Sequence, residues 1–171
     1  MDLKQFIRDI PDFPQPGILF RDITPLLQDP EAFRSVVDHF TEEYRDAGLA
    51  AVVAIESRGF IFGAPIARNL GISFVPVRKA GKLPARHISV EYSLEYGTSQ
   101  LDIHEDALKR GDKALIVDDL LATGGTANAA AKLVELLGAR VHAMAFVIEL
   151  AFLHGRDRLQ DYEVLSLVTY E

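Results

Sequence analysis

The fold class is decided by one stretch of the chain, residues 115–126, which reads LIVDDLLATGGT. Its apolar beginning predicts a buried strand over Lys113–Val117, after which Asp118 and Asp119 are expected in an exposed loop. The Thr-Gly-Gly-Thr turn then opens an alanine-rich helix, predicted over Ala127–Leu137. A strand, a glycine turn and a helix in this order are typical of an α/β fold with a parallel sheet.

The same stretch indicates a ligand that combines a phosphate with a sugar. Glycines let the backbone approach a phosphate closely, and a helix N-terminus presents free N–H groups with a partial positive charge. Asp118 and Asp119 would repel a phosphate, but they can accept hydrogen bonds from sugar hydroxyls or hold Mg²⁺ that bridges to a diphosphate. The stretch therefore predicts a site for a phosphorylated sugar, against the alternative of a plain acidic turn before a glycine-rich helix.

Strands and helices alternate outward from this stretch. Periodicity and capping residues predict helices over 29–48 and 60–70. Short apolar runs predict strands over residues 50–55, 72–77, 98–103, 141–148 and 164–168. The residues between the second and third of these strands, 78–95, are expected to be irregular. We therefore predict a single α/β domain over residues 1–171, with a mainly parallel central sheet flanked by helices.

Composition limits the class of protein. Of the 171 residues, 49% are hydrophobic and 25% are charged, which is an ordinary globular balance. The chain has no cysteine, which excludes a disulfide framework, a thiolate metal site and a cysteine nucleophile. The longest apolar run, residues 49–55, is too short to span a membrane, and the start shows no secretory signal. We therefore expect a cytoplasmic protein that has no membrane partner.

Charge gives a further indication of the ligand. The net charge of −7 argues against nucleic acid as a partner. The charge is uneven, because residues 70–90 contain no Asp or Glu but do contain Arg78, Lys79, Lys82 and Arg86. A basic segment in an acidic protein indicates either a pocket for a small polyanion or a solvated loop.

Competing motifs are missing from the sequence. No Gly-x-Gly-x-x-Gly follows a predicted strand, and no Gly-x-x-x-x-Gly-Lys-[Ser/Thr] occurs. The five histidines include neither a His-Glu-x-x-His motif nor a close pair, so no metal site built from protein ligands is predicted.

Residues 115–126 resemble the phosphoribosyl-diphosphate signature of the type I phosphoribosyltransferases. Four other segments resemble, in the same order, those members of the family that act on adenine: PGILFRDITPL at 16–26, ESRGF at 56–60, RKAGKLP at 78–84 and YSLEYG at 92–97. The resemblance covers nearly the whole chain. It implies the type I phosphoribosyltransferase fold, with a small base-binding hood over about residues 1–30 and a flexible catalytic loop over about residues 79–97.

The resemblance also implies that the protein is an enzyme of purine salvage. The protein would transfer the 5-phosphoribosyl group from phosphoribosyl diphosphate to adenine, giving AMP and diphosphate. Mg²⁺ is the implied cofactor, held mainly by the diphosphate and the ribose rather than by protein ligands. A homodimer is the implied assembly.

The implied substrate contacts divide between the two halves of phosphoribosyl diphosphate. The 5′-phosphate would lie on the turn formed by Ala122, Thr123, Gly124, Gly125 and Thr126. The ribose hydroxyls would bind Asp118 and Asp119, as the residues themselves suggest. The diphosphate would meet Ser57, Arg58, Arg78, Lys79 and Lys82, with Lys82 coming from either its own or the partner subunit.

The base and the chemistry involve other segments. Adenine would stack on Phe20, with backbone groups of Leu19 and Arg21 at its edge, although a Phe after Pro-Gly is by itself more often a core residue. The catalytic residues would be Glu95, Arg58 and Tyr96, and Tyr96 is either part of a lid or a packing residue.

Two alternatives differ from this interpretation. A 6-oxopurine phosphoribosyltransferase would have an acid for the base N7 where this chain has Ala122, so Ala122 favours adenine and points to Glu95 for the proton. A regulator that senses phosphoribosyl diphosphate and binds nucleic acid would need a basic surface, which the net charge of −7 disfavours.

Overall fold

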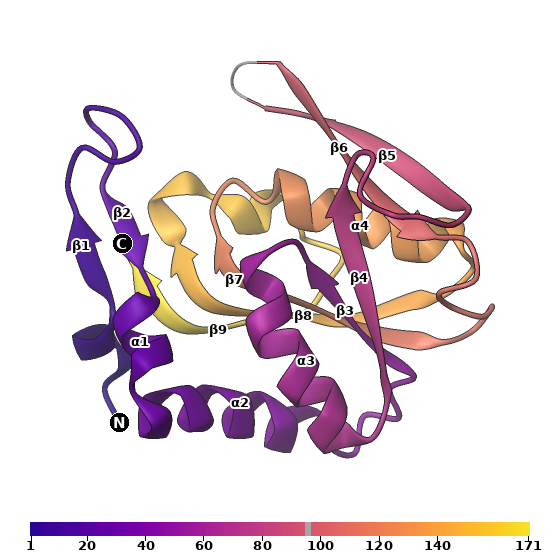
Figure 1. Ribbon diagram of the computed structural model, residues 1–171, viewed down its shortest axis with the longest axis horizontal. Helices are drawn as coiled ribbons and strands as arrows, with labels where there is room; N and C mark the ends of the chain where they lie inside the picture. Colours follow the sequence, from indigo (N-terminus) through magenta and orange to yellow (C-terminus); the bar gives the residue numbers. More distant parts are fainter. Residues whose placement is uncertain (95–96) are drawn as a thin grey trace.

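A seven-stranded sheet forms the centre of the protein in the computed structural model, which describes residues 1–94 and 97–171 (Figure 1). The strands are β3 (Ala51–Ile55), β4 (Ser73–Lys79), β5 (His87–Ser93), β6 (Thr98–His104), β7 (Lys113–Leu121), β8 (Arg140–Leu150) and β9 (Val164–Tyr170). Their order is β5-β6-β4-β3-β7-β8-β9. The pairs from β4 to β9 are parallel, whereas β6 and β5 extend the β4 edge in antiparallel orientation. The prediction of an α/β fold with a mainly parallel sheet is confirmed.

Helices cover both faces of this sheet. They are α1 (Thr24–Gln28), α2 (Pro30–Tyr44), α3 (Arg58–Leu70) and α4 (Gly125–Leu136). Apolar side chains of α2 and α3 pack with Val52 and Leu115 on one face, and those of α4 pack with Val53 and Ile116 on the other. Because neighbouring residues of a strand point to opposite faces, β3 is buried on both sides, as its continuous apolar sequence predicts.

The helix predicted over 29–48 begins where its capping residue placed it but ends earlier. The Asp29 side chain accepts hydrogen bonds from the N–H groups of Glu31 and Ala32. At the other end, α2 stops at Tyr44, because the N–H groups of Arg45 and Ala47 bond back three residues rather than four.

A small two-stranded ribbon precedes the first helices and stands beside the main sheet (Figure 1). It consists of the antiparallel strands β1 (Arg8–Ile10) and β2 (Phe20–Asp22) and follows a helical turn, η1 (Leu3–Phe6). Arg21 ties this N-terminal ribbon to the sheet, because it pairs with Asp9 and its guanidinium lies 3.7 Å from the ring centroid of Tyr170 on β9.

The expectation of an irregular segment over residues 78–95 is wrong for residues 87–93. Residues 87–93 form β5, which pairs with β6 along its full length. Ile88, Val90 and Tyr92 are half-buried against the core on the α4 side, while the residues between them are exposed. A half-buried strand is recognised by alternating apolar and polar residues. The prediction above used continuous apolar runs instead, so the polar residues at alternate positions of β5 concealed the strand.

Two short helical turns, η2 (Ala151–Leu153) and η3 (Gly155–Arg158), connect β8 to β9 and are drawn in gold in Figure 1. No helix in the described part of the chain is both long and apolar enough to cross a membrane.

Candidate active site

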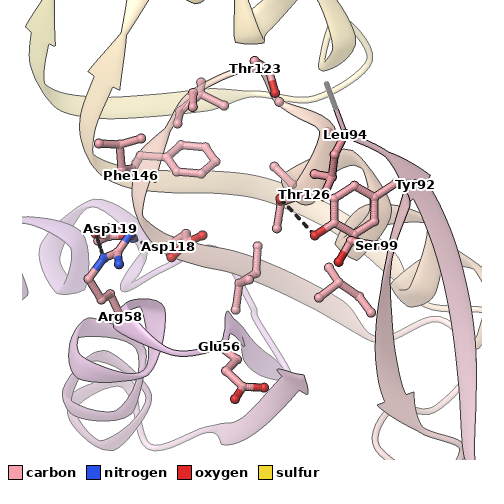
Figure 2. Close-up of a pocket in the computed structure, with 18 of the residues that line it drawn as sticks. Glu56, Arg58, Tyr92, Leu94, Ser99, Asp118, Asp119, Thr123, Thr126 and Phe146 are labelled. Carbon is pink, nitrogen blue, oxygen red and sulfur yellow. Dashed lines mark hydrogen bonds and ion pairs between the residues drawn. The ribbon is translucent and has the colours of Figure 1, made fainter. Parts of the chain in front are cut away.

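A cavity of about 350 Å³ opens beyond the carboxyl ends of β3 and β7 (Figure 2). This is the position in which parallel α/β sheets bind their ligands. The cavity is lined by Ile55, Glu56, Arg58, Lys79, Tyr92, Leu94, Ser99, Leu101, Asp118, Asp119, Leu120, Leu121, Ala122, Thr123, Gly124, Gly125, Thr126, Ala127 and Phe146. It therefore gathers the paired carboxylates, the glycine turn and two of the predicted basic residues.

The paired carboxylates belong to a strand and not to the exposed loop that the sequence led us to expect. Strand β7 continues to Leu121, because β8 is long enough to pair with it as far as Glu149. Asp118 pairs in register with Phe146, and Asp119 is only 4% exposed. Both carboxylates are therefore held by the sheet itself.

The two carboxylates differ in their electrostatic surroundings. Burial raises the pKa of Asp118 well above its ordinary value, and the nearby Asp119 carboxylate raises it further. Asp119 instead forms an ion pair with the Arg58 guanidinium, in which Arg58 Nε donates to Asp119 Oδ2 at 2.5 Å. Asp118 thus holds a proton more readily than an ordinary carboxyl group, while Asp119 is paired with a cation.

Arg58 is positioned by the start of α3. Gly59 lets this helix approach β7, because a Cβ on Gly59 would lie 2.7 Å from the Val117 carbonyl oxygen. The Glu56–Ser57 peptide bond just before the helix is cis. Burial alone would lower the pKa of Arg58, but the Asp119 carboxylate outweighs it and the pKa is raised. Arg58 is therefore a fixed cation on one side of the cavity.

The glycine turn at the start of α4 is held by backbone contacts with the η3 turn. Gly124 has φ of +82°, and a Cβ there would lie 2.4 Å from the Gly155 carbonyl oxygen. A Cβ on Gly155 would in turn lie 2.4 Å from the Ala122 carbonyl oxygen. Sequence reasoning missed Gly155, and no local signal identifies it, since its partners are distant in the sequence.

The N-terminus of α4 carries the features expected of a phosphate site. Gly124 is its N-cap residue and has no side chain with which to bond the first N–H groups. The first turn of the helix contains no acidic residue. These N–H groups are thus available to an anion that enters the cavity.

Only part of the predicted diphosphate contacts meet in the cavity. Arg58 and Lys79 line it, whereas Ser57, Arg78 and Lys82 are not among the described residues that do so. Arg78 donates to the Glu56 carboxylate at 3.2 and 3.3 Å, and these bonds lower the pKa of Glu56 despite its burial. Lys82 lies exposed in the turn after β4.

The β5–β6 hairpin contributes side chains that sequence reasoning missed. Tyr92, Leu94 and Ser99 line the cavity, and Thr126 Oγ1 donates to the Tyr92 hydroxyl at 3.4 Å (Figure 2). The alternation that reveals β5 would also have placed Tyr92 on its inner face. Glu95 and Tyr96 lie outside the described residues.

The predicted base-binding residues lie on the N-terminal ribbon, outside the cavity lining. The Phe20 ring is half-buried, 5.1 Å from the Phe13 ring and 5.9 Å from the Arg58 guanidinium. The Leu19 side chain is 46% exposed. The Arg21 side chain pairs with Asp9 and lies over the Tyr170 ring.

Metal-binding side chains do not cluster in the described part of the chain. Residues 1–94 and 97–171 contain no group of three or more His, Cys, Asp or Glu side chains that could hold a metal ion.

Comparison with known proteins identifies the family. The model of the phosphoribosyl transferase domain matches residues 24–168. The adenine phosphoribosyltransferase of Carboxydothermus hydrogenoformans is 62% identical over 170 residues, covering 99% of this chain and 100% of that protein. The chain belongs to the adenine phosphoribosyltransferase family.

Solved structures of adenine phosphoribosyltransferases have the same fold. That from Thermoanaerobacter pseudethanolicus is 51% identical with a TM-score of 0.95, covering 99% of this chain and 98% of the other. That from Saccharomyces cerevisiae, complexed with D-2,5-dideoxy-2,5-imino-altritol 1,6-bisphosphate and adenine, is 42% identical with a TM-score of 0.92, covering 97% and 96%. The predicted family and the type I phosphoribosyltransferase fold are both confirmed.

Proposed function

We propose that this protein transfers the 5-phosphoribosyl group from phosphoribosyl diphosphate to adenine, releasing diphosphate and forming AMP in purine salvage. One observation carries the proposal. In a chain 62% identical to an adenine phosphoribosyltransferase over its length, the uncapped α4 N-terminus and the β7 carboxylates face the same cavity. This arrangement can bind a phosphate and a sugar diol at once.

Phosphoribosyl diphosphate would lie along the cavity from the α4 turn to Arg58. The turn Ala122–Thr126 takes the 5′-phosphate through backbone N–H groups and the Thr123 and Thr126 hydroxyls. Asp118 and Asp119 accept hydrogen bonds from the ribose hydroxyls.

The diphosphate would reach the basic side of the cavity. Arg58 and Lys79 line it, and the Ser57 backbone stands next to Arg58 at the start of α3. Arg78 can reach the diphosphate if it gives up its hydrogen bonds to Glu56 and donates to the diphosphate oxygens instead. We propose that Lys82, which is exposed in the turn after β4, contacts the diphosphate bound to a partner subunit.

Adenine would bind under the N-terminal ribbon, which then acts as the hood. The Phe20 ring approaches Arg58 to 5.9 Å, which brings the ribbon to the edge of the cavity. Stacking of a base on an aromatic ring contributes roughly 1–3 kcal/mol. Backbone groups of Leu19 and Arg21 read the edge of the base, since a carbonyl accepts from an amino group and repels a 6-oxo group.

The reaction would be a displacement at the anomeric carbon. The adenine N9 forms a bond to this carbon, the bond to the diphosphate oxygen breaks, and the adenine loses one proton. Arg58 and Lys79 stabilise the charge that develops on the departing diphosphate. Glu95 would handle the proton on the purine ring, and Tyr96 would help to close the hairpin over the cavity, which excludes competing water.

Mg²⁺ fits this site as part of the substrate. Asp119 is already paired with Arg58, and one further carboxylate is too few ligands for an ion that prefers an octahedral oxygen shell. Diphosphate and ribose oxygens with water would supply most of that shell, with Asp118 nearby. When bound, the ion neutralises charge on the leaving diphosphate.

The remaining expectations follow from the family. We propose a single domain over residues 1–171, in a cytoplasmic homodimer in which the Lys82 of one subunit serves the other. Sedimentation of the purified protein tests the dimer. Mixed dimers of Lys82→Ala and Arg58→Ala subunits test the shared cavity, because an intact site forms in them only if Lys82 serves the partner subunit.

Product formation tests the function directly. The protein is incubated with phosphoribosyl diphosphate, Mg²⁺ and each free base, and the nucleotide is quantified. Adenine should be converted far faster than hypoxanthine, guanine or orotate. Equal or better turnover of hypoxanthine would support the 6-oxopurine alternative and overturn the proposal.

A further inference from the structure

The η3 turn, Gly155–Arg158, lies directly behind the predicted phosphate site. Its first residue packs backbone to backbone against the turn before α4, with both Gly124 and Gly155 too close to the other's loop to accept a Cβ. Such contacts leave no space for the two loops to move independently. The backbone from which the η3 side chains project is therefore fixed relative to the start of α4.

The two arginines of η3 have different surroundings. Arg156 forms a two-pronged ion pair with the Glu149 carboxylate, at 2.7 Å for each bond, and also donates to the Val164 carbonyl at 3.0 Å. These bonds anchor η3 to β8 and β9. Arg158 points the other way, because its Nη1 lies 3.5 Å from the position that a Cβ on Gly125 would occupy.

This position brings an exposed cation next to a helix end of the same sign. Gly125 is the first residue of α4, and a helix N-terminus carries a partial positive charge that repels a guanidinium. The first turn of α4 contains no acid, and no carboxylate of residues 1–94 or 97–171 lies within ion-pairing distance of Arg158. A phosphate bound at the turn would be attracted by both the helix and the guanidinium.

We propose that Arg158 is a further 5′-phosphate-binding residue, which holds this group of phosphoribosyl diphosphate and of AMP against the α4 turn. The inference rests on the proposed function, because that function places the 5′-phosphate on residues 122–126. Arg158 adds a charge-assisted hydrogen bond to a site otherwise built from N–H groups and hydroxyls. The nucleoside, which lacks the phosphate, gains nothing from it.

The test compares AMP with adenosine in the variants Arg158→Gln and Arg158→Lys. The affinity for AMP is measured by titration calorimetry, and the affinity for adenosine is measured by its competition with AMP. Arg158→Gln should weaken AMP binding by about ten- to a hundredfold, the usual range for a hydrogen bond to a charged group, and leave adenosine unchanged. Arg158→Lys keeps the charge without the planar fork and should lose less. In turnover, the KM for phosphoribosyl diphosphate should rise while the KM for adenine stays constant.

Arg140→Gln is the matched control, because Arg140 is also exposed but lies at the start of β8, at the opposite end of the sheet from the cavity. It should change neither affinity. Unchanged AMP affinity in Arg158→Gln, or an equal loss for AMP and adenosine, would overturn the inference. A wild-type protein that makes no AMP from adenine would instead overturn the proposed function, so the two failures are distinguishable.

Discussion

Two walls of the cavity are constructed in different ways. The wall formed by β7 and the turn to α4 consists of buried strand residues and of loops in backbone contact, with Gly124 and Gly155 interlocked. The wall formed by the β5–β6 hairpin is a ribbon in which every second residue of β5 is exposed, and it reaches the turn through the 3.4 Å bond between Tyr92 and Thr126. The first wall is therefore already formed before the substrate binds, whereas the hairpin is an element that can close over the bound substrate.

The comparison predicts that changes in the hairpin affect the chemical step more than binding. Glu95→Gln keeps the size of the side chain but cannot exchange a proton with the base. It should lower kcat by ~10²–10⁴ and leave the KM for phosphoribosyl diphosphate nearly constant. Steady-state kinetics at saturating substrate measure this, once the absence of a product burst shows that chemistry limits the rate.

Glu91→Gln provides the control for this prediction. Glu91 is an exposed residue of β5, four positions before Glu95 in the sequence, so the variant removes a charge without removing the proposed proton carrier. It should have wild-type kinetics. A kcat of Glu95→Gln within a few-fold of wild type would remove Glu95 from the mechanism.

Changes in the β7 wall should affect binding first. Asp119→Asn removes the charge that pairs with Arg58 and weakens the acceptor for the ribose hydroxyls. We expect kcat/KM for phosphoribosyl diphosphate to fall by about ten- to a hundredfold, as for the loss of a charge-assisted hydrogen bond. Asp161→Asn changes an exposed carboxylate after η3 and should leave kcat/KM unchanged. Equal kinetics in the two variants would exclude the diol role.

The contact between Gly124 and Gly155 gives a prediction that links stability and binding. Gly155→Ala would push a methyl group into the Ala122 carbonyl, and overpacking of this kind costs about 1–3 kcal/mol. We expect a lower Tm together with a higher KM for phosphoribosyl diphosphate. Gly111→Ala is the control, because Gly111 has φ of +86° but no neighbour within 4 Å. It should lower Tm through backbone strain and leave KM unchanged, so a matching KM in both variants would argue against the phosphate turn.

Replacing Asp118 by Asn should raise the stability of the folded protein slightly, in contrast to the destabilising change at Gly155. Its pKa is raised in the folded protein by burial and by Asp119, so its stabilising contribution is complete below its ordinary pKa and is lost as pH rises through the raised value. At neutral pH Asp118→Asn should therefore raise the Tm of the ligand-free protein while impairing turnover. The Tm difference should disappear at about pH 4 and below. A lower Tm at neutral pH would contradict this account.

The same two walls differ in how far the sequence predicts them. The strand, the glycine turn and the helix are contiguous in residues 113–137, so local patterns were sufficient for the fold class and for a phosphorylated sugar as ligand. The extent of β7 was not predictable in this way, because its last residues are strand only through pairing with β8. The contact of Gly155 with the turn is equally non-local.

Strand β5 of the hairpin was missed for a different reason, whereas β6 was predicted over residues 98–103. Tyr92 belongs to a strand whose apolar residues alternate with Ser89, Glu91 and Ser93. A search for continuous apolar runs does not detect such a strand. The basic residues also show the limits of a prediction from sequence order alone. Arg78 and Lys79 are adjacent in sequence, yet Lys79 lines the cavity itself, whereas Arg78 is connected to it only through hydrogen bonds to Glu56.

Binding of ribose 5-phosphate tests most directly whether one wall binds and the other acts. The ligand carries the phosphate and the hydroxyls but neither base nor diphosphate, and its affinity is measured by calorimetry for the wild type, Asp119→Asn and Glu95→Gln. The affinity of Glu95→Gln should stay within about twofold of wild type, whereas Asp119→Asn should bind at least about tenfold more weakly. A loss in Glu95→Gln as large as that in Asp119→Asn would contradict this division between the walls.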